Sequence, residues 1–455
     1  MLYNVPLPYL DDAAAYYAAL ADLPWAVWLD STGLDRYDIL CAQPVATFVT
    51  NGISTEITDA TGIRYSTGDP FDLLRRKLDK PASSIQGIPF AGGALGYWGY
   101  DLARRIMTLP AQAKDTERLP DMAVGIYDWA VVLDHQEKTA QLVSRQREQA
   151  TAQVLPQIIE RLQGNSGVPQ QAFHIHGHIT SNFTRAEYEV AFDAVQRYLH
   201  EGDCYQVNLA QRYAARASGD ALQAYLELRR LSPAPYSAFL NLPQAQILCA
   251  SPECFLHVHE GSVETRPIKG TRPRMADALR DVQVAHELQH SSKDRAENLM
   301  IVDLLRNDLG KSCTPGSVQV PKLFEVESFA HVLHLVSTVS GELAGGQDAL
   351  ALLRNCFPGG SVTGAPKQRA MEIIEQLEPQ RRGVYCGTIG YVGYDGNMDS
   401  NIAIRTLVYS GGEVRFWVGG GIVADSDAAA EYQETLDKAA GMLELLQQFG
   451  GSIIP

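Results

Sequence analysis

The sequence has 455 residues and a formal net charge of −15, with 45% hydrophobic and 20% charged residues. This composition is typical of a globular protein and excludes a largely disordered chain, and the negative charge argues against a partner that is nucleic acid or an anionic membrane. No run approaches the about 18 apolar residues that a membrane-spanning helix needs.

In the first third of the chain, apolar runs closed by turn residues predict strands at 25–33, 37–42, 46–52 and 122–134. Amphipathic segments at 71–79 and 147–164 predict helices. The stretch 164–182 is rich in Gly, Pro, Ser and Gln, which is typical of a linker.

The rest of the chain alternates strands and helices without a regular βαβ period. Thr184 and Glu187 have the spacing of a capping box and predict the start of a helix that runs to His200. Strands are expected at 247–250 and 255–259, and long helices at about 277–309, 366–378 and 428–448. This order predicts an α+β fold rather than a doubly wound parallel sheet.

The seven cysteines are scattered and form no C-x-x-C pair. A disulfide framework or a zinc cage is therefore not expected, and reduced thiols favour the cytoplasm. The first residues lack the basic and apolar regions of a signal peptide, which points to the same compartment.

Residues 286–290 read H-E-x-x-H, a pattern that binds zinc when a third ligand follows. Lys293 and Ala296 stand where the longer zinc motif needs Gly and His. We therefore interpret this segment as two solvated histidines on a helix.

Two predicted helices each carry a pair of acids at i,i+3 spacing: Asp294 with Glu297, and Glu431 with Glu434. Four carboxylates from two helices could hold Mg²⁺, a hard cation that prefers oxygen ligands. The alternative is a solvated acidic face on each helix, with Glu434 paired to Lys438 one turn later.

The segment RPIKGTRPR (266–274) places Lys269 just before a glycine that permits a turn. A lysine desolvated there, beside other cations, would favour the neutral amine that attacks carbon. The alternative is a basic surface turn. The segment 358–375 runs from a Gly-rich loop into a helix whose N-terminus could bind a carboxylate or phosphate. The Gly-rich segment 419–425 could let the backbone approach a ligand closely. The alternative for both is a tight turn.

Several motifs in order between 251 and 435 together resemble the chorismate-binding family: SPECF, RPIKGTRPR, DRAENLMIVDLLRNDLG, FPGGSVTGAPK, RGVYCGTIGY and GGGIVADSDAAAEYQET. The family includes anthranilate, aminodeoxychorismate, isochorismate and salicylate synthases. The resemblance implies antiparallel sheets packed as a β-sandwich with helices outside. It also implies an N-terminal regulatory or structural half (1–165) intertwined with a chorismate-binding catalytic region (180–455).

Two positions distinguish the branches of this family. Anthranilate synthases carry Ala where this chain has Lys269, and isochorismate and salicylate synthases carry Lys where this chain has Gln206. The combination resembles the aminodeoxychorismate synthase component I branch, whose product feeds 4-aminobenzoate and folate synthesis. The alternatives are anthranilate synthase component I and a non-catalytic regulator that binds chorismate or tryptophan.

The resemblance also implies roles for individual residues. Lys269 would attack C2 of chorismate, Glu253 would protonate the leaving C4 hydroxyl, and ammonia would then add at C4 and expel the lysine. Glu297 and Glu434 would bind Mg²⁺, with Asp294 and Glu431 beside them or acting through water. Further positions that line the family's substrate site are His334, Thr363, Tyr385, Arg405, Gly421 and Lys438.

Two partners follow from the same resemblance. A tryptophan pocket is expected around Ser31, Tyr37, Asp38, Pro235 and Tyr236. The chain is too short to include a fused glutaminase, so a separate glutamine amidotransferase subunit is expected to supply ammonia.

Overall fold

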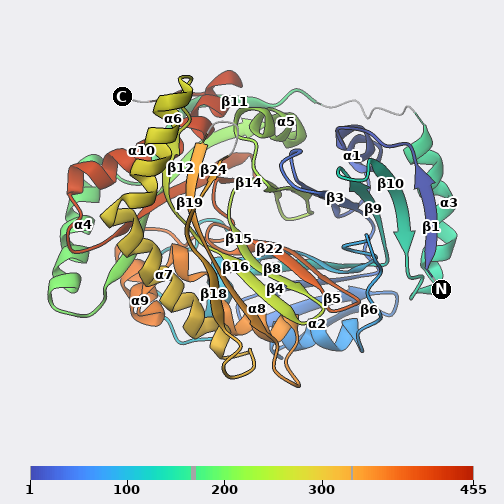
Figure 1. The fold of residues 1–455 in the computed structure, drawn as a ribbon. Helices are drawn as coiled ribbons and strands as arrows, with labels where there is room; N and C mark the ends of the chain where they lie inside the picture. The colour runs from blue at the N-terminus through green and yellow to red at the C-terminus, as the bar shows by residue number, and fades with distance from the viewer. Residues whose placement is uncertain (1, 165–170, 329–331, 454–455) are drawn as a thin grey trace.

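The computed structural model describes residues 2–164, 171–328 and 332–453. Two large sheets form the centre of the molecule and helices cover their outer faces (Figure 1). The predicted α+β class with two antiparallel sheets is confirmed. In the described part of the chain, no helix is long and apolar enough to span a membrane.

The first sheet has 13 strands. In order across the sheet they are β1 (Tyr3–Leu7), β10 (Thr139–Ser144), β9 (Trp129–Asp134), β3 (Tyr37–Cys41), β2 (Ala26–Asp30), β13 (Tyr236–Asn241), β14 (Gln246–Ser251), β23 (Thr406–Ser410), β24 (Glu413–Ile422), β12 (Gln206–Ser218), β11 (His174–Ser181) and β25 (Ser452–Ile453), with β20 (Gly364–Ala365) beside β12. All described pairings are antiparallel except β11 with β25.

The second sheet has 12 strands. Their order is β17 (Ile268–Pro273), β19 (Val332–Glu342), β16 (Ser262–Arg266), β15 (Cys254–His259), β22 (Met398–Asn401), β21 (Thr388–Gly393), β7 (Gly93–Trp98), β8 (Met122–Tyr127), β4 (Ala46–Asn51), β5 (Ser54–Asp59) and β6 (Gly62–Ser66), with β18 (Gln319–Ser328) beside β19.

The helices complete two hydrophobic layers around the sheets. Strand β2 of the first sheet shows this arrangement, because successive side chains of a strand point to opposite faces. Val27 belongs to the core between the two sheets, and Trp28 packs with the outer helices. The helices of that outer layer are α1 (Ala14–Leu20), α3 (Gln149–Gln163), α5 (Ala221–Leu231) and α10 (Ala428–Gln448).

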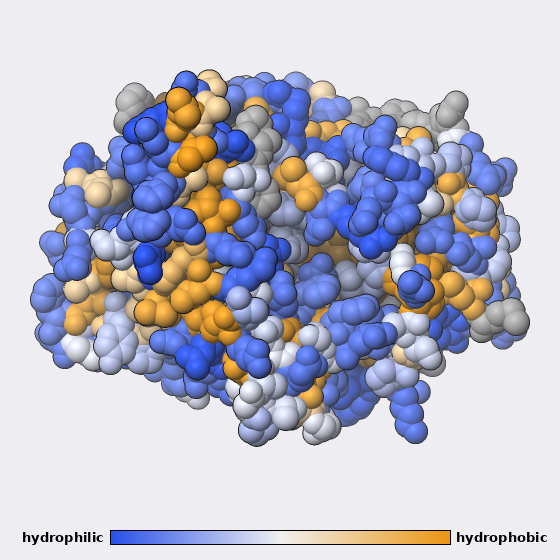
Figure 2. Space-filling model, in the orientation of Figure 1, coloured by the Kyte–Doolittle hydropathy of each residue, from blue (hydrophilic) through white to orange (hydrophobic). Residues whose placement is uncertain are grey.

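The other helices lie around the second sheet and one end of the first. Those that join the large core are α2 (Pro70–Leu78), α7 (Ser292–Gly310), α8 (Ala349–Cys356) and the 3₁₀ turns η1 (Tyr100–Arg105) and η2 (Gly360–Val362). Helices α4 (Arg185–His200) and α9 (Lys367–Leu377) pack with β12, and α6 (Ala278–His290) covers β17–β19. Apolar side chains gather over α6 and α7, where Leu279, Val282 and Leu299 are exposed (Figure 2).

Both halves of the chain contribute to both sheets. Strand β2 pairs with β13 in the first sheet, and β7 pairs with β21 in the second. The separate roles expected for 1–165 and 180–455 stay a prediction.

The structure confirms one local prediction and revises two others. The capping box at Thr184 and Glu187 is confirmed, because each side chain bonds the other residue's backbone N–H. The linker prediction is wrong for 174–181, which form strand β11, while residues 165–170 lie outside the described part. The helix expected at about 277–309 is two helices, because Ser291 adopts an extended conformation and caps α7.

Candidate active site

The chain crosses from one sheet to the other at two neighbouring places, and each crossing carries a charged residue. Glu253 lies between β14 and β15, and Arg405 lies between β22 and β23. The two crossings are joined by backbone hydrogen bonds from Ile402 N to Glu253 O (3.0 Å) and from Ala250 N to Arg405 O (3.1 Å). Strand pairing in both sheets therefore fixes Glu253 and Arg405 next to each other.

Lys269 lies on β17, at the edge of the second sheet. Its Nζ donates to the carbonyl oxygen of Ser361 at 3.2 Å. Burial lowers the pKa of Lys269, although the carboxylates of Glu253 and Glu297 act in the opposite direction. The alternative of a basic surface turn is not supported, because the side chain points into a site lined with acids.

Glu253 is buried, and only 5% of the residue's surface is exposed to solvent. Burial raises its pKa, while the Lys269 ammonium and a hydrogen bond from Ser361 act to lower it. Burial thus drives both members of the pair towards their neutral forms, a carboxylic acid and a free amine. These are the protonation states of a general acid and an amine nucleophile.

The glycine after Lys269 allows helices α6 and α7 to approach β17 closely. Gly270 has φ +80°, and a Cβ there would lie 2.9 Å from both Asp294 Cγ and Leu288 Cδ1. Asp294 does not point freely into the site, because the Arg272 guanidinium pairs with its carboxylate at 2.9 Å.

Three acids from α7 and α10 influence one another across the site. Burial raises the pKa of Glu297 and of Glu431. The carboxylates of Glu431 and Glu434 raise the pKa of Glu297 further, and that of Glu434 raises the pKa of Glu431. Gly420 on β24 makes room for the α10 pair, because a Cβ there would lie 2.9 Å from Glu431 Oε2 and 3.5 Å from Glu434 Oε1.

Two of these acids already have partners. Glu431 accepts from Ser426 Oγ at 2.7 Å. Burial pushes the pKa of Glu434 upward, but the Lys438 ammonium 2.7 Å from its Oε1 outweighs burial and lowers the pKa. Lys438 also donates to Gly419 O at 2.9 Å, so its position is fixed.

The acids of α7 and α10 have oxygen donors that suit a divalent cation. Within residues 2–164, 171–328 and 332–453, no group of three or more His, Cys, Asp or Glu side chains lies close enough to hold a metal ion. The donor set of Glu297, Glu431 and Glu434 still fits Mg²⁺ chemically, because Mg²⁺ keeps several waters and needs only one or two protein carboxylates. The place of Asp294 in the metal set stays a prediction.

Arg405 and His334 form the polar wall expected to meet the substrate. Arg405 is half-buried, and in the described part of the chain its guanidinium forms no ion pair or side-chain hydrogen bond. His334 Nδ1 is 2.8 Å from Thr271 Oγ1. Burial, followed by the positive charge of Arg405, lowers the pKa of His334 to about 4, so the imidazole is neutral near pH 7.

The remaining predicted substrate positions lie around β12 and β24, where Gly421 belongs to β24 itself. Thr363 is fully buried and donates to Gly359 O at 3.0 Å. Tyr385 stacks on Trp417 with ring centroids 6.1 Å apart. Gly421 packs directly on Gln206, since a Cβ at Gly421 would lie 2.0 Å from Gln206 Nε2.

Gln206 itself is an unusual side chain. It is 0% exposed, and among the described residues neither its Nε2 nor its Oε1 has a hydrogen-bond partner. A buried amide without partners is costly, which points to a polar ligand that completes it.

Comparisons with known proteins agree with this geometry. The family model for chorismate binding enzymes matches residues 26–444. The chain belongs to the chorismate binding enzyme family. It is 48% identical to aminodeoxychorismate synthase component 1 of Klebsiella aerogenes, over 97% of this chain and 98% of that protein. The protein of the same name from Escherichia coli K12 is also 48% identical, with 96% and 97% covered.

Proteins named anthranilate synthase match the chain as well, at lower identity than these two. The component 1 protein of Streptomyces coelicolor is 38% identical over 98% of this chain and 89% of that protein. The crystal structure of anthranilate synthase component I from Streptococcus pneumoniae TIGR4 superposes with a TM-score of 0.80 at 33% identity, covering 90% of this chain and 92% of that chain.

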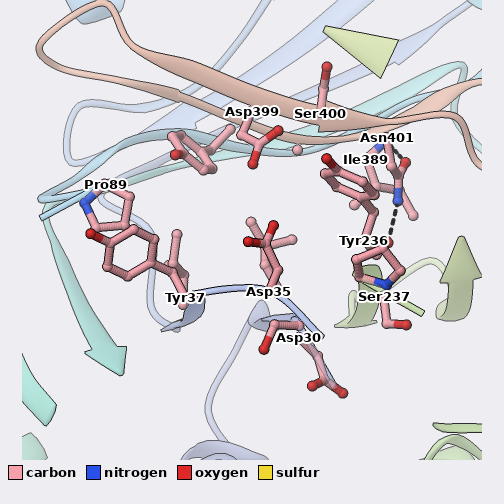
Figure 3. Close-up of a pocket in the computed structure, with 16 residues that line it drawn as sticks. Asp30, Asp35, Tyr37, Pro89, Tyr236, Ser237, Ile389, Asp399, Ser400 and Asn401 are labelled. Carbon is pink, nitrogen blue, oxygen red and sulfur yellow. Dashed lines mark hydrogen bonds between the residues drawn. The ribbon is translucent and has the colours of Figure 1, made fainter. Parts of the chain in front are cut away.

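A cavity between the two sheets is the second site that the family resemblance predicted. Ser31, Tyr37, Pro235 and Tyr236 line it from the first sheet (Figure 3). The space between its walls is about 540 Å³ and opens to solvent. Whether this family member binds tryptophan there stays a prediction.

Asp38 was expected in this cavity but lies behind its wall. Its Oδ1 accepts from Ser31 N at 2.7 Å, and its Oδ2 is 3.1 Å from His135 Nε2. The carboxylates that point into the space are those of Asp35 and Asp399, from opposite walls (Figure 3). The sequence analysis named neither residue. Asp399 belongs to the other sheet and lies about 360 residues after Asp35, so a local pattern does not bring the two together.

The two histidines of the H-E-x-x-H segment interact with each other on helix α6. The rings of His286 and His290 stack with centroids 4.0 Å apart on the outer helix α6. His290 Nδ1 bonds the His286 carbonyl at 2.9 Å, one turn earlier on the same helix. The interpretation as solvated histidines accounts for both contacts.

Proposed function

We propose that this chain is an aminodeoxychorismate synthase component I, which converts chorismate and ammonia to 4-amino-4-deoxychorismate for 4-aminobenzoate and folate synthesis. The observation that carries the proposal is the pair formed by Lys269 and Glu253, which burial drives towards a free amine and a protonated acid. The 48% identity to proteins of that name supports it.

The two side chains would divide one substitution into two steps. In the first, the free amine of Lys269 bonds to C2, the two conjugated ring double bonds shift, and the C4–O bond breaks as Glu253 delivers its proton, which releases water and leaves Glu253 ionised. In the second, ammonia bonds to C4, both double bonds shift back, the C2–Nζ bond breaks to return the free amine, and the new ammonium group gives a proton back to Glu253. The net reaction exchanges the C4 hydroxyl for an amino group.

The rest of the site would hold a dianionic substrate. The Arg405 guanidinium forms no ion pair or side-chain hydrogen bond with the described residues. A guanidinium can bind a carboxylate with two parallel hydrogen bonds. Bound Mg²⁺, held by Glu297 and Glu434 with Glu431 beside them, would neutralise the ring carboxylate. His334, Thr363, Tyr385 and Lys438 would form the remaining walls.

Gln206 supports ammonia over water as the second nucleophile. A carboxamide cannot act as the base that removes a proton from water, whereas ammonia attacks without prior deprotonation. Because both polar atoms of Gln206 lack partners in the described structure, the amide is free to bond the incoming nucleophile or the substrate.

A glutamine amidotransferase subunit would supply ammonia, as the words "component 1" in the names of the relatives suggest. The N-terminal half would bind tryptophan in the cavity between the sheets. All seven cysteines are free and buried, which favours the cytoplasm.

Product identification tests the proposed function. The chain is incubated with chorismate, Mg²⁺ and ammonium, and the products are separated by chromatography. We expect 4-amino-4-deoxychorismate. Anthranilate fluorescence would instead indicate an anthranilate synthase, and binding of chorismate without its consumption would indicate a regulator.

A further inference from the structure

A second charged pair, Arg382 and Glu378, lies behind the proposed active site. Arg382 is 1% exposed and precedes β21. Its Nε and Nη2 donate to the two carboxylate oxygens of Glu378 at 2.9 and 2.6 Å. Glu378 also accepts from Ala210 N on β12 at 2.9 Å. A buried ion pair is costly unless its hydrogen bonds are satisfied, and here they are.

The other donors of Arg382 hold backbone segments that carry site residues. Nη1 donates to Val362 O at 2.9 Å, and Nη2 donates to Asn208 O at 2.8 Å. Val362 lies between Ser361, whose carbonyl accepts from Lys269, and Thr363. Asn208 N in turn donates to Thr363 O at 2.8 Å, so β12 and the loop 360–363 are joined twice.

The guanidinium also contacts an aromatic residue of the site. Its central carbon lies 5.6 Å from the centroid of Tyr385 and 4.9 Å from that of Tyr100. Both distances are in the range of cation–π contacts. One side chain thus connects β12, the loop 360–363 and Tyr385.

We propose that Arg382 is a positioning residue that holds the loop 360–363, strand β12 and Tyr385 in the arrangement that the reaction at Lys269 needs. It contacts neither Lys269 nor Glu253, so it acts through the groups it holds. Only a guanidinium offers donors in several fixed directions in one plane, whereas an ammonium is a single point charge. The role rests on the proposed function of the site.

The central test replaces Arg382 by lysine, which keeps the charge and loses the planar donors. Because small displacements of reacting groups slow the chemical step, we expect kcat for chorismate consumption to fall by about tenfold or more, with KM for chorismate changed by less than about threefold. Arg415→Lys is the matched control, because Arg415 is also buried and pairs with Glu117.

The control separates positioning from general stability. Arg415 bonds Glu117 and Ser410, and neither belongs to the loop or to the proposed site. We expect both variants to lower the melting temperature similarly, while Arg415→Lys keeps kcat within about twofold. Equal losses of kcat in the two variants, or a loss confined to KM, would overturn the proposal.

Two further measurements cover the remaining outcomes. If Arg382→Lys does not fold, the double variant Arg382→Gln with Glu378→Gln removes both buried charges and should fold with the same loss of kcat. Hydrogen exchange without substrate does not depend on the proposed reaction. We expect the Asn208 and Thr363 amides to exchange faster in Arg382→Lys than in Arg415→Lys, and equal rates would contradict the role.

Discussion

The charges of Glu253 and Lys269 act on each other across the site, and the pKa values of the two groups are shifted in opposite directions. Burial raises the pKa of the Glu253 carboxyl and lowers that of the Lys269 ammonium. Although each charge would stabilise the other, burial is the larger influence on both groups. An acid and an amine that are both neutral can act in one step, the acid on the leaving oxygen and the amine on carbon.

Replacing Lys269 by alanine should abolish turnover, because the nucleophile is removed. We expect chorismate consumption to fall at least about 1000-fold, as for other essential nucleophiles. Lys322→Ala is the control, since Lys322 is an exposed lysine of the neighbouring β18 that pairs only with Glu325 among the described residues. Normal turnover by Lys269→Ala would contradict a nucleophilic lysine.

Replacing Glu253 by glutamine should slow the reaction by about 100-fold or more, the usual contribution of a general acid. The amide keeps the shape of the side chain but has no proton to deliver to the leaving hydroxyl. Steady-state kinetics with chorismate and ammonium measure the effect, and a change of less than threefold would assign the acid to another group.

The same variant should change how stability depends on pH. Because the folded-state pKa of Glu253 is raised, its contribution to stability is fully present below the unfolded pKa of about 4.3 and is lost as pH rises through the folded value. Glu253→Gln should therefore gain stability relative to the parent chain as pH rises through that window. Denaturant unfolding across pH measures the difference, which a pH-independent offset would contradict.

Magnesium should stabilise the chain through the acids of α7 and α10. A ligand at a hundred times its Kd adds about 2.7 kcal/mol of stability, so Mg²⁺ should raise Tm. Glu297→Gln and Glu434→Gln should each lose this increase. Without Mg²⁺, Glu297→Gln should be no less stable than the parent, because it removes a buried carboxylate whose pKa is raised by burial.

A matched control for the metal experiment is Glu325→Gln, which changes an exposed acid of β18. It should keep the full Mg²⁺ effect on Tm. An increase of equal size in all three glutamine variants would show that Mg²⁺ binds elsewhere.

The cavity between the sheets should bind an aromatic amino acid. Tyr37 and Tyr236 provide apolar walls, and the Asp35 and Asp399 carboxylates would attract an ammonium group. We expect titration calorimetry to detect L-tryptophan and to find weaker binding of indole-3-propionate, which lacks the amine. Tyr236→Ala should weaken L-tryptophan binding by about tenfold, because it removes a buried aromatic wall.

The local motifs of the sequence contain the proposed reacting groups but not the contacts that hold them. Lys269, Glu253 and the acids of α7 and α10 stand in local motifs, and the structure brings them to one site. The residues that hold these groups in place are more remote in the sequence. Arg272 forms an ion pair with Asp294, and the Ser361 carbonyl accepts a hydrogen bond from Lys269. Such contacts depend on which strands pair across the sheets, and a one-dimensional pattern does not contain that information.

The misplaced expectations have the same cause. Polar composition suggested a linker at 164–182, but pairing with β12 makes 174–181 a strand. Asp38 belongs to a strand whose alternation turns its side chain towards His135 instead of the cavity. Arg382 stands in the motif RGVYCGTIGY, but its bonds to β12 and to the loop 360–363 depend on contacts that the motif does not contain.

The most direct test of the central claim is mass spectrometry of the chain after incubation with chorismate and Mg²⁺ in the absence of ammonia. The account predicts an adduct with the mass of chorismate less one water, located on the peptide that contains Lys269 and released when ammonium is added. An adduct on another residue, or turnover to 4-amino-4-deoxychorismate by the Lys269→Ala chain, would contradict covalent catalysis by Lys269.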